Sequence, residues 1–220
     1  MNYKKEQLEE AHIALLSTLK KCEKIDTSTF GKSQKTLLER RIRALRLALE
    51  LIEKERGDNT HKAFSALYGD NPQILILGTF PSVKSRESNG YYGNPQNQFW
   101  RIIADIFNEN IDFDDYEQKK MMIFKHGIAL WDTLISCEIK GSADTNIKNE
   151  VGNTEIPAFM KYFSINKVLF NGKKAFDFYC KYNGLESLGG AEYHIMPSTS
   201  PAYAGMNFKE KVSVWREKLT

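Results

Sequence analysis

The hydrophobic positions of this chain follow two different periods. Up to about residue 56 the apolar residues recur every three to four positions, which is typical of amphipathic helices. From Gln73 onward, short and mostly apolar runs alternate with segments of helical period. The pattern therefore predicts a helical region first and a mixed region of strands and helices after it.

Two helices are predicted in the first region, one from Tyr3 to about Lys24 and one from about Ser33 to Arg56. The turn between them, residues 26–33, is short, and two amphipathic helices with a short connection favour an antiparallel hairpin. Its exposed face carries a group of arginines: Arg40, Arg41, Arg43 and Arg46. Neighbouring glutamates favour a solvated face, and an accessory contact with nucleic acid or a protein partner is the alternative.

Four apolar runs predict strands that are buried on both faces of a sheet. These runs are Ile74–Leu77, Gly127–Trp131, Lys167–Phe170 and Tyr193–Met196. Helices are predicted at about Asn97–Phe107, Asp112–Phe124, Ile156–Phe163, Lys173–Tyr182 and Asn207–Lys218. Because strands alternate with helices, we predict the α/β class: a three-layer α/β/α sandwich whose central four-stranded sheet is mostly parallel.

Polar and glycine-containing stretches set the expected boundaries. We assign residues 1–65 to an accessory helical hairpin and residues 66–220 to the α/β/α domain. The segment from Gly57 to Pro72 is expected to be a linker with one helical turn. The polar segment Asp132–Asn153 is expected to be mostly loop with a short helix.

The amino-acid composition indicates the class of protein but not its function. Charged residues make up 27% and hydrophobic residues 41% of the 220 positions, as in soluble globular proteins, and the net charge of +3 is too small to argue for nucleic acid by itself. Cys22, Cys137 and Cys180 form no CxxC pair and are predicted to be reduced thiols. No apolar run approaches the roughly 18 residues of a membrane span, and the N-terminus lacks the apolar core of a signal peptide. We expect a cytoplasmic monomer with no membrane association.

Two polar loops follow predicted strands and carry the candidate chemistry, Gly78–Asn97 and Pro197–Gly205. In a parallel sheet both loops emerge at the carboxyl edge, where open α/β sheets bind ligands. The loops contain no HExxH motif, no Ser–His–Asp candidate and no glycine fingerprint for a dinucleotide. They offer aromatic rings and neutral hydrogen-bonding side chains: Phe80, Tyr91, Tyr92, Phe99, Trp100, Asn94, Asn97, Ser198, Thr199 and Ser200. Flat rings combined with neutral polar groups suit an extruded nucleobase.

Three motifs in these loops also carry a family resemblance. They are GTFPS at residues 78–82, YYGNPQNQFW at residues 91–100 and PSTSPA at residues 197–202. Together they resemble the uracil-DNA glycosylase superfamily, and within it the hypoxanthine (deoxyinosine) DNA glycosylase branch. Residues 141–144 and 168–176 also resemble the mismatch-specific uracil glycosylases of this superfamily. The resemblance covers about Gln73 to Lys218 and leaves the hairpin outside.

The resemblance implies a monofunctional glycosylase, without metal or organic cofactor, that removes a deaminated base from double-stranded DNA and leaves an abasic site. Asn97 matches the catalytic asparagine of the hypoxanthine branch. Its amide oxygen can hold an attacking water, and an oxocarbenium-like transition state needs only a weak, well-placed nucleophile. Phe80 stands where other branches have a catalytic Asp or Asn, and Met196 replaces the histidine of the uracil enzymes. Both departures count against uracil as the preferred base.

The other candidate residues divide by their expected role. Those expected to bind the base are Gly78, Thr79, Phe80, Tyr91, Tyr92 and Asp132. Those expected to contact DNA are Pro81, Ser82, Ser198, Thr199, Ser200, Pro201 and Ala202. Within the second group, Ser198 and Ser200 resemble phosphate clamps, and Pro201–Met206 would be the loop pressed into the duplex.

Several alternatives stay open. Asp132 either accepts a hydrogen bond from the purine ring or serves as a helix cap or salt-bridge partner, and the two tyrosines either stack on the base or pack the loop. A deoxyinosine glycosylase is the leading hypothesis for the whole protein. The alternatives are a uracil or mismatch-specific DNA glycosylase and a catalytically silent nucleic-acid-binding protein of the same fold.

Overall fold

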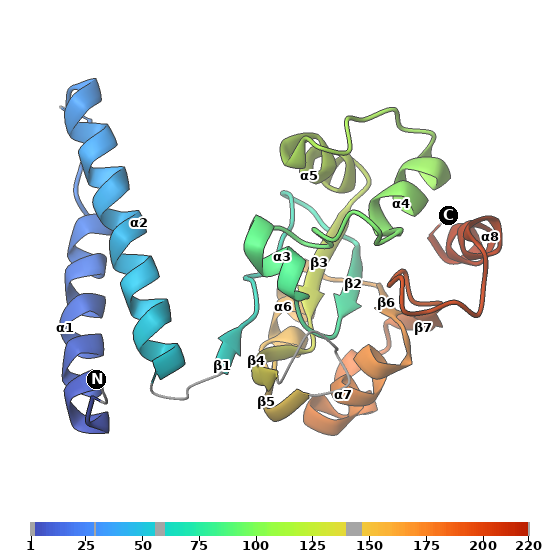
Figure 1. The fold of residues 1–220 in the computed structure, drawn as a ribbon. Helices are drawn as coiled ribbons and strands as arrows, with labels where there is room; N and C mark the ends of the chain where they lie inside the picture. The colour runs from blue at the N-terminus through green and yellow to red at the C-terminus, as the bar shows by residue number, and fades with distance from the viewer. Residues whose placement is uncertain (1–2, 29, 56–59, 140–146, 220) are drawn as a thin grey trace. The chain divides into compact units, whose positions relative to one another are not determined.

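The computed structural model describes residues 3–28, 30–55, 60–139 and 147–219. The chain divides into two compact units, one up to Thr60 and one from His61 onward. The first unit consists of helices α1 (Lys5–Glu23) and α2 (Lys32–Glu55), which pack side by side as a hairpin (Figure 1). None of the helices in the described ranges is both long enough and apolar enough to cross a membrane.

The hairpin is held by the apolar faces that its sequence predicted. The side chains buried between its helices are Leu8, Leu19, Cys22 and Leu49. Arg46 forms an ion pair of 2.8 Å with Glu23 across the two helices. Arg40, Arg41 and Arg43 are exposed, and none of the ion pairs between described residues involves them.

The second unit is built around a parallel sheet of four strands in the order β3-β2-β6-β7. The strands are β2 (Ile74–Gly78), β3 (Ile128–Asp132), β6 (Lys167–Asn171) and β7 (Glu192–Met196). The middle residues of β2, β3 and β6 are fully buried, as their apolar sequences predicted. The same prediction is wrong for β7, because it lies at the edge of the sheet and its Tyr193 and Ile195 are exposed. The predicted parallel sheet is therefore confirmed.

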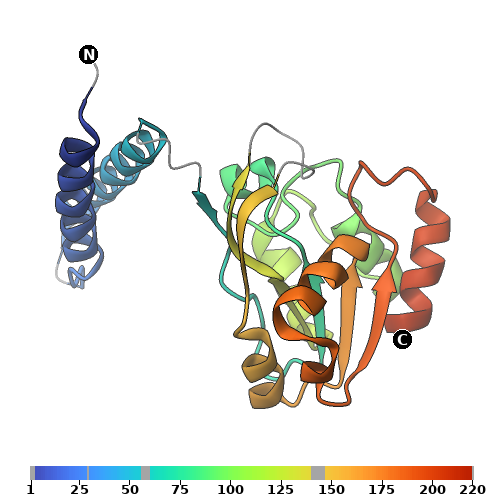
Figure 2. The ribbon, with the colours of Figure 1, turned by 90° about the horizontal axis from the view of Figure 1, so that it is seen from below.

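Helices cover both faces of this sheet (Figures 1 and 2). Their bounds are α4 (Phe99–Phe107), α5 (Tyr116–Lys125), α6 (Ile156–Phe163), α7 (Lys173–Asn183) and α8 (Phe208–Leu219). Ile76 and Leu169 point toward a core formed with α4, α5 and α8. Leu75 and Phe170 point the opposite way, toward α6 and α7. The side chains of successive strand residues thus pack into two separate hydrophobic cores, one on each face of the sheet, which confirms the three-layer α/β/α sandwich.

A second, smaller sheet was not predicted. Strands β1 (Thr60–Lys62), β4 (Leu134–Ile139) and β5 (Ile147–Gly152) form a sheet in the order β1-β4-β5, with β4 and β5 antiparallel. The expected helical turn before Pro72 and the expected loop and short helix within residues 132–153 are therefore wrong. β1 and β5 are rich in polar residues and β4 mixes apolar with polar ones, so none of them shows the continuous apolar run that predicted the strands of the main sheet. The motif at residues 141–144 lies outside the described residues.

The main sheet brings the two candidate loops to one edge. β2 and β3 pair in parallel register, so that Gly78 lies beside Asp132 at their carboxyl ends. β6 and β7 end in the same way with Asn171 beside Met196. Every loop that follows one of these strands therefore leaves the sheet on the same side.

Candidate active site

The predicted site residues meet in one cavity of about 440 Å³ at this edge of the sheet. Its lining includes every residue that the sequence assigned to catalysis, base binding or DNA contact: Gly78, Thr79, Phe80, Pro81, Ser82, Tyr91, Tyr92, Asn97, Asp132, Ser198, Thr199, Ser200, Pro201 and Ala202. Four further lining residues were absent from those assignments: Phe64, Ser85, Asn94 and Asn171. Asn171 follows a predicted buried strand, so the rule that ligands bind at the carboxyl edge could have pointed to it.

The first loop is more ordered than its sequence suggested, because it contains the short helix α3 (Val83–Ser88). Ser82 caps this helix by accepting a hydrogen bond from the backbone N–H of Ser85 at 3.2 Å. The Ser85 hydroxyl oxygen in turn accepts a bond from the N–H of Gly93 at 3.1 Å. A Cβ at Gly93 would collide with the Ser88 hydroxyl and lie 3.1 Å from the Ser85 Cα, so this close approach requires glycine. These contacts fold the loop back on itself.

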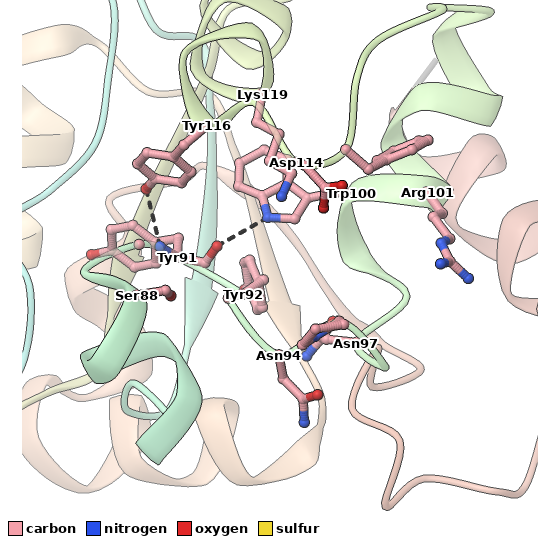
Figure 3. A pocket seen from close by; sticks show the side chains of 14 residues that line it. Ser88, Tyr91, Tyr92, Asn94, Asn97, Trp100, Arg101, Asp114, Tyr116 and Lys119 are labelled. Atoms are coloured by element: carbon pink, nitrogen blue, oxygen red, sulfur yellow. Dashed lines mark hydrogen bonds between the residues drawn. The ribbon is translucent and has the colours of Figure 1, made fainter.

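Tyr91 anchors the loop to the core. Its N–H donates to the Tyr116 hydroxyl at 3.0 Å, and its carbonyl accepts a bond of 2.9 Å from the Trp100 indole (Figure 3). Its own hydroxyl donates to the Ser65 carbonyl at 3.1 Å. The side chain is 5% exposed, and burial raises the pKa of its hydroxyl well above the usual range. Tyr91 therefore lines the cavity mainly as a fixed wall.

Tyr92 is placed by an unusual backbone conformation, with φ of 53° in the left-handed region. This turn directs its ring onto Phe99, where the two rings stack with centroids 4.0 Å apart and planes 23° apart. Burial raises the pKa of the Tyr92 hydroxyl, and a hydrogen bond from Asn171 partly opposes that shift. Phe80 faces the smaller sheet, packs on Leu134 and lies 9% exposed.

Asp132 is a buried carboxyl at the end of β3. It is 4% exposed, and among the described residues its Oδ2 has no hydrogen-bond partner. Burial disfavours the charged form and raises the pKa of Asp132 to about 8. A Cβ at Gly78 would stand 2.5 Å from Asp132 Oδ1, so the carboxyl occupies the space that this glycine leaves open. At neutral pH the side chain is therefore mainly a neutral acid with a proton to donate.

Asn97 stands at the entrance to helix α4. Its Oδ1 accepts a hydrogen bond of 3.0 Å from the backbone N–H of Phe99, which holds the amide in one orientation. An amide oxygen has two lone pairs, so the same atom keeps one for a water molecule. The residue is half-buried and lines the cavity. Next to it, the Gln98 N–H donates to the Thr199 carbonyl at 3.0 Å and joins the two loops.

The second loop is anchored to the sheet through Thr199, which is fully buried. Asn171 forms two hydrogen bonds with Thr199. Its Nδ2 donates to the Thr199 hydroxyl at 2.9 Å, and its Oδ1 accepts from the Thr199 N–H at 2.9 Å. Ser198 and Ser200 stay partly exposed at the cavity. Their hydroxyl oxygens each accept a bond of 3.3 Å from the N–H two residues later, so both hydroxyl protons point elsewhere. The loop thus presents two oriented hydroxyl groups.

A second cavity of about 330 Å³ lies against the first loop (Figure 3). It shares Tyr91, Tyr92, Asn94 and Asn97 with the main cavity. In the described part of the chain, His, Cys, Asp and Glu side chains form no group of three that could hold a metal ion. His194, the histidine closest in sequence to the second loop, pairs with Glu192 on β7.

Comparisons with known proteins concern the second unit. Residues 66–219 match the family model described as the uracil DNA glycosylase superfamily. Two relatives carry the name hypoxanthine DNA glycosylase. The one from Methanosarcina acetivorans is 34% identical over 155 residues, which cover 70% of this chain and 94% of the relative. The one from Methanosarcina barkeri is 31% identical over 156 residues, which cover 71% and 96%.

A solved structure leads to the same family. It is the solution NMR structure of a candidate uracil DNA glycosylase from Methanosarcina acetivorans. The match has a TM-score of 0.61 and a sequence identity of 31%, and it covers 73% of this chain and 99% of that one.

Proposed function

Because the chain belongs to the uracil DNA glycosylase superfamily and is a DNA glycosylase, we propose that it removes hypoxanthine from deoxyinosine in double-stranded DNA. The observation that supports this substrate is a cavity with a buried neutral acid, Asp132, and a half-buried amide, Asn97, on its wall. Relatives that share about a third of the sequence carry the corresponding name.

Asn97 is the proposed catalytic residue. Its Oδ1 would hold a water molecule that attacks C1′ of the flipped nucleotide. The bond from C1′ to N9 breaks, the electron pair leaves with the base, and the water's proton finally goes to the departing purine. Because the transition state resembles an oxocarbenium ion, orienting a weak nucleophile accounts for much of the expected acceleration.

Asp132 is the proposed base-reading residue. Hypoxanthine presents O6 and N7 as acceptors along one edge, whereas adenine replaces O6 with an amino donor. A protonated carboxyl can donate to such an acceptor, and it stabilises negative charge that develops on the departing base. Of the two roles that the sequence left open, we therefore favour base reading, with Asp132 as donor instead of acceptor.

The remaining contacts are assigned by position. Tyr92, Gly78 and Thr79 would frame the base, and Ser198 and Ser200 would receive the phosphates beside it. Pro201–Met206 would enter the duplex and occupy the space that the flipped nucleotide leaves. The proposal takes the acting species as a cytoplasmic monomer, with which the free thiols of its three cysteines are compatible.

An excision assay tests the substrate. Duplexes that carry one deoxyinosine, deoxyuridine or deoxyxanthosine are incubated with the protein, and abasic sites are then cleaved with alkali. We expect cleavage chiefly at deoxyinosine. Cleavage mainly at deoxyuridine would instead establish the uracil alternative.

Substitution of Asn97 tests the mechanism. Since the Asn97 side chain also accepts the N–H of Phe99, the first residue of α4, its replacement by Ala is expected to cost about 1 kcal/mol of stability as well as excision. Asn97→Ser keeps an oxygen that can accept the Phe99 N–H but lacks the amide, so it should fold normally, bind lesion DNA and excise at least 100-fold more slowly, about 3 kcal/mol in barrier height. The exposed Asn110→Ala serves as the control. Full activity of Asn97→Ser would show that another group orients the water.

A further inference from the structure

Lys211 is a charged side chain inside the second unit that the proposed mechanism does not use. It lies on α8 among the inward positions Val212 and Trp215, and it is only 2% exposed. Burial lowers the pKa of its ammonium group. No carboxylate among the described residues forms an ion pair with it. An apolar side chain would fill such a helix position at lower energetic cost, because a buried charge without a countercharge is strongly disfavoured.

The ammonium group instead binds two neutral oxygens from different parts of the site. Lys211 Nζ donates to Gln98 Oε1 at 3.0 Å and to the Tyr203 carbonyl at 3.0 Å. It also lies 5.2 Å from the centre of the Tyr203 ring, within the range of a cation–π contact. Gln98 is the residue after Asn97, and Tyr203 lies in the loop proposed to enter the duplex. One cation therefore bridges the start of α4 and the middle of that loop.

Few other contacts hold the outer part of the loop. Residues 201–205 are exposed, and within the loop the Tyr203 N–H bonds to the Ser200 carbonyl at 3.0 Å. The base of the loop is tied separately, by the Trp215 indole on the Pro197 carbonyl at 3.0 Å. The Asn207 and Glu210 pair then caps α8 just beyond the loop. Lys211 is thus the described side chain that links the exposed part of the loop to the helix that follows Asn97.

We propose that Lys211 is a positioning residue that couples the loop 201–206 to Asn97. When DNA displaces the loop, the Tyr203 carbonyl would shift the ammonium group of Lys211. The ammonium group would in turn shift Gln98 and, through the backbone, the amide of Asn97 that orients the water. The role of Lys211 in excision rests on the proposed function, whereas the mechanical link between the two segments does not.

Four variants of the full chain test the coupling. Lys211→Met keeps the length of the side chain but removes the charge and both hydrogen bonds. Gln98→Leu removes one of those bonds and leaves the Tyr203 contact in place, and the third variant combines both changes. Lys218→Met is the matched control, because it removes a charge from the far end of the same helix.

The first measurement is amide hydrogen exchange, which needs no enzymatic activity. Lys211→Met should speed exchange at least tenfold in residues 199–206 and also in residues 97–99, while exchange in β2 stays unchanged. Lys218→Met should leave both segments as in the wild type. If amide exchange in residues 199–206 or in residues 97–99 were the same in Lys211→Met as in the wild type, the proposal would be overturned.

The second measurement is the single-turnover excision rate, read beside thermal unfolding and affinity for a duplex with a stable abasic analogue. Lys211→Met and Gln98→Leu should each lower the rate about tenfold, and the double variant should be no slower than Lys211→Met. An excision rate that falls only in proportion to the fraction of folded protein would contradict the coupling. So would a double variant whose loss in rate equals the product of the losses in the two single variants. If the wild type excises no base, the proposed function fails, and the exchange result still decides the role of Lys211.

Discussion

Replacing Asp132 by Asn should make the protein more stable, although the residue lies in the proposed active site. The carboxyl has a pKa of about 8 in the folded chain and an ordinary value of 3.8. Between these values the unfolded chain is ionised and the folded chain is not, so folding must take up a proton. Each pH unit in that window lowers the wild-type stability by about 1.4 kcal/mol.

The expected magnitude follows from the width of this window. Below pH 3.8 the penalty is absent, it grows as the pH rises, and it becomes constant above pH 8. At pH 7 it reaches about 4 kcal/mol, and an asparagine, which does not ionise, avoids it. The new amide protons need partners, which offsets part of the gain, so we expect Asp132→Asn to gain about 2–4 kcal/mol. In a domain of this size that is roughly 10 °C in melting temperature.

The assay is urea unfolding followed by tryptophan fluorescence between pH 5 and pH 8. All three tryptophans, Trp100, Trp131 and Trp215, lie in the second unit, so the signal reports on that unit alone. The gain of Asp132→Asn over the wild type should increase with pH, and the exposed Asp70→Asn should show no such trend. If the gain were the same at pH 5 and pH 8, or if the variant were less stable at pH 8, the carboxyl would not be buried and neutral as argued.

Further predictions concern groups around the same cavity. Excision of hypoxanthine by the wild type should fall as the pH rises through about 8, where Asp132 loses its proton, whereas Asp132→Asn should lack that fall in a pH–rate profile. Gly78→Ala should lose about 1–3 kcal/mol in thermal unfolding and should also slow excision, because its Cβ would stand 2.5 Å from the Asp132 carboxyl. Asn171→Leu leaves the buried Thr199 without its two partners and should cost about 1–3 kcal/mol, with faster amide exchange in the second loop. Trp100→Phe removes the indole bond that fixes the first loop and should cost a similar amount, about 1–3 kcal/mol, checked by urea unfolding followed by circular dichroism.

The central architecture could be predicted from the sequence because its signals are local. The run Ile74–Leu77 is apolar at every position, which indicates a strand buried on both faces, and Ile156–Phe163 has the period of a helix. Parallel strands end at one edge, so the loops after Gly78 and Met196 had to meet. The fourteen assigned residues accordingly line a single cavity.

The smaller sheet could not be predicted in the same way. β5 is polar, β4 mixes apolar and polar residues, and their pairing shows register shifts between Leu134 and Glu138. The third strand, β1, has three residues and precedes the main sheet in the chain, so no short window of sequence contains the signal for its place beside β4. Helix α3 was missed for a related reason, because Ser82 and Ser85 look like loop residues until the cap they form is seen.

Motif and periodicity by themselves predicted the four strands of the main sheet, the helices that cover it, and most of the side chains that line the candidate site. Only the tertiary structure decided the chemical state of those side chains. Burial around β3 raises the pKa of Asp132, and Lys211 bridges Gln98 and Tyr203 because α8 turns its side chain inward between them. The free-energy cost of burying a charge depends on all the groups that surround it in the folded protein, and a sequence does not show which residues those are.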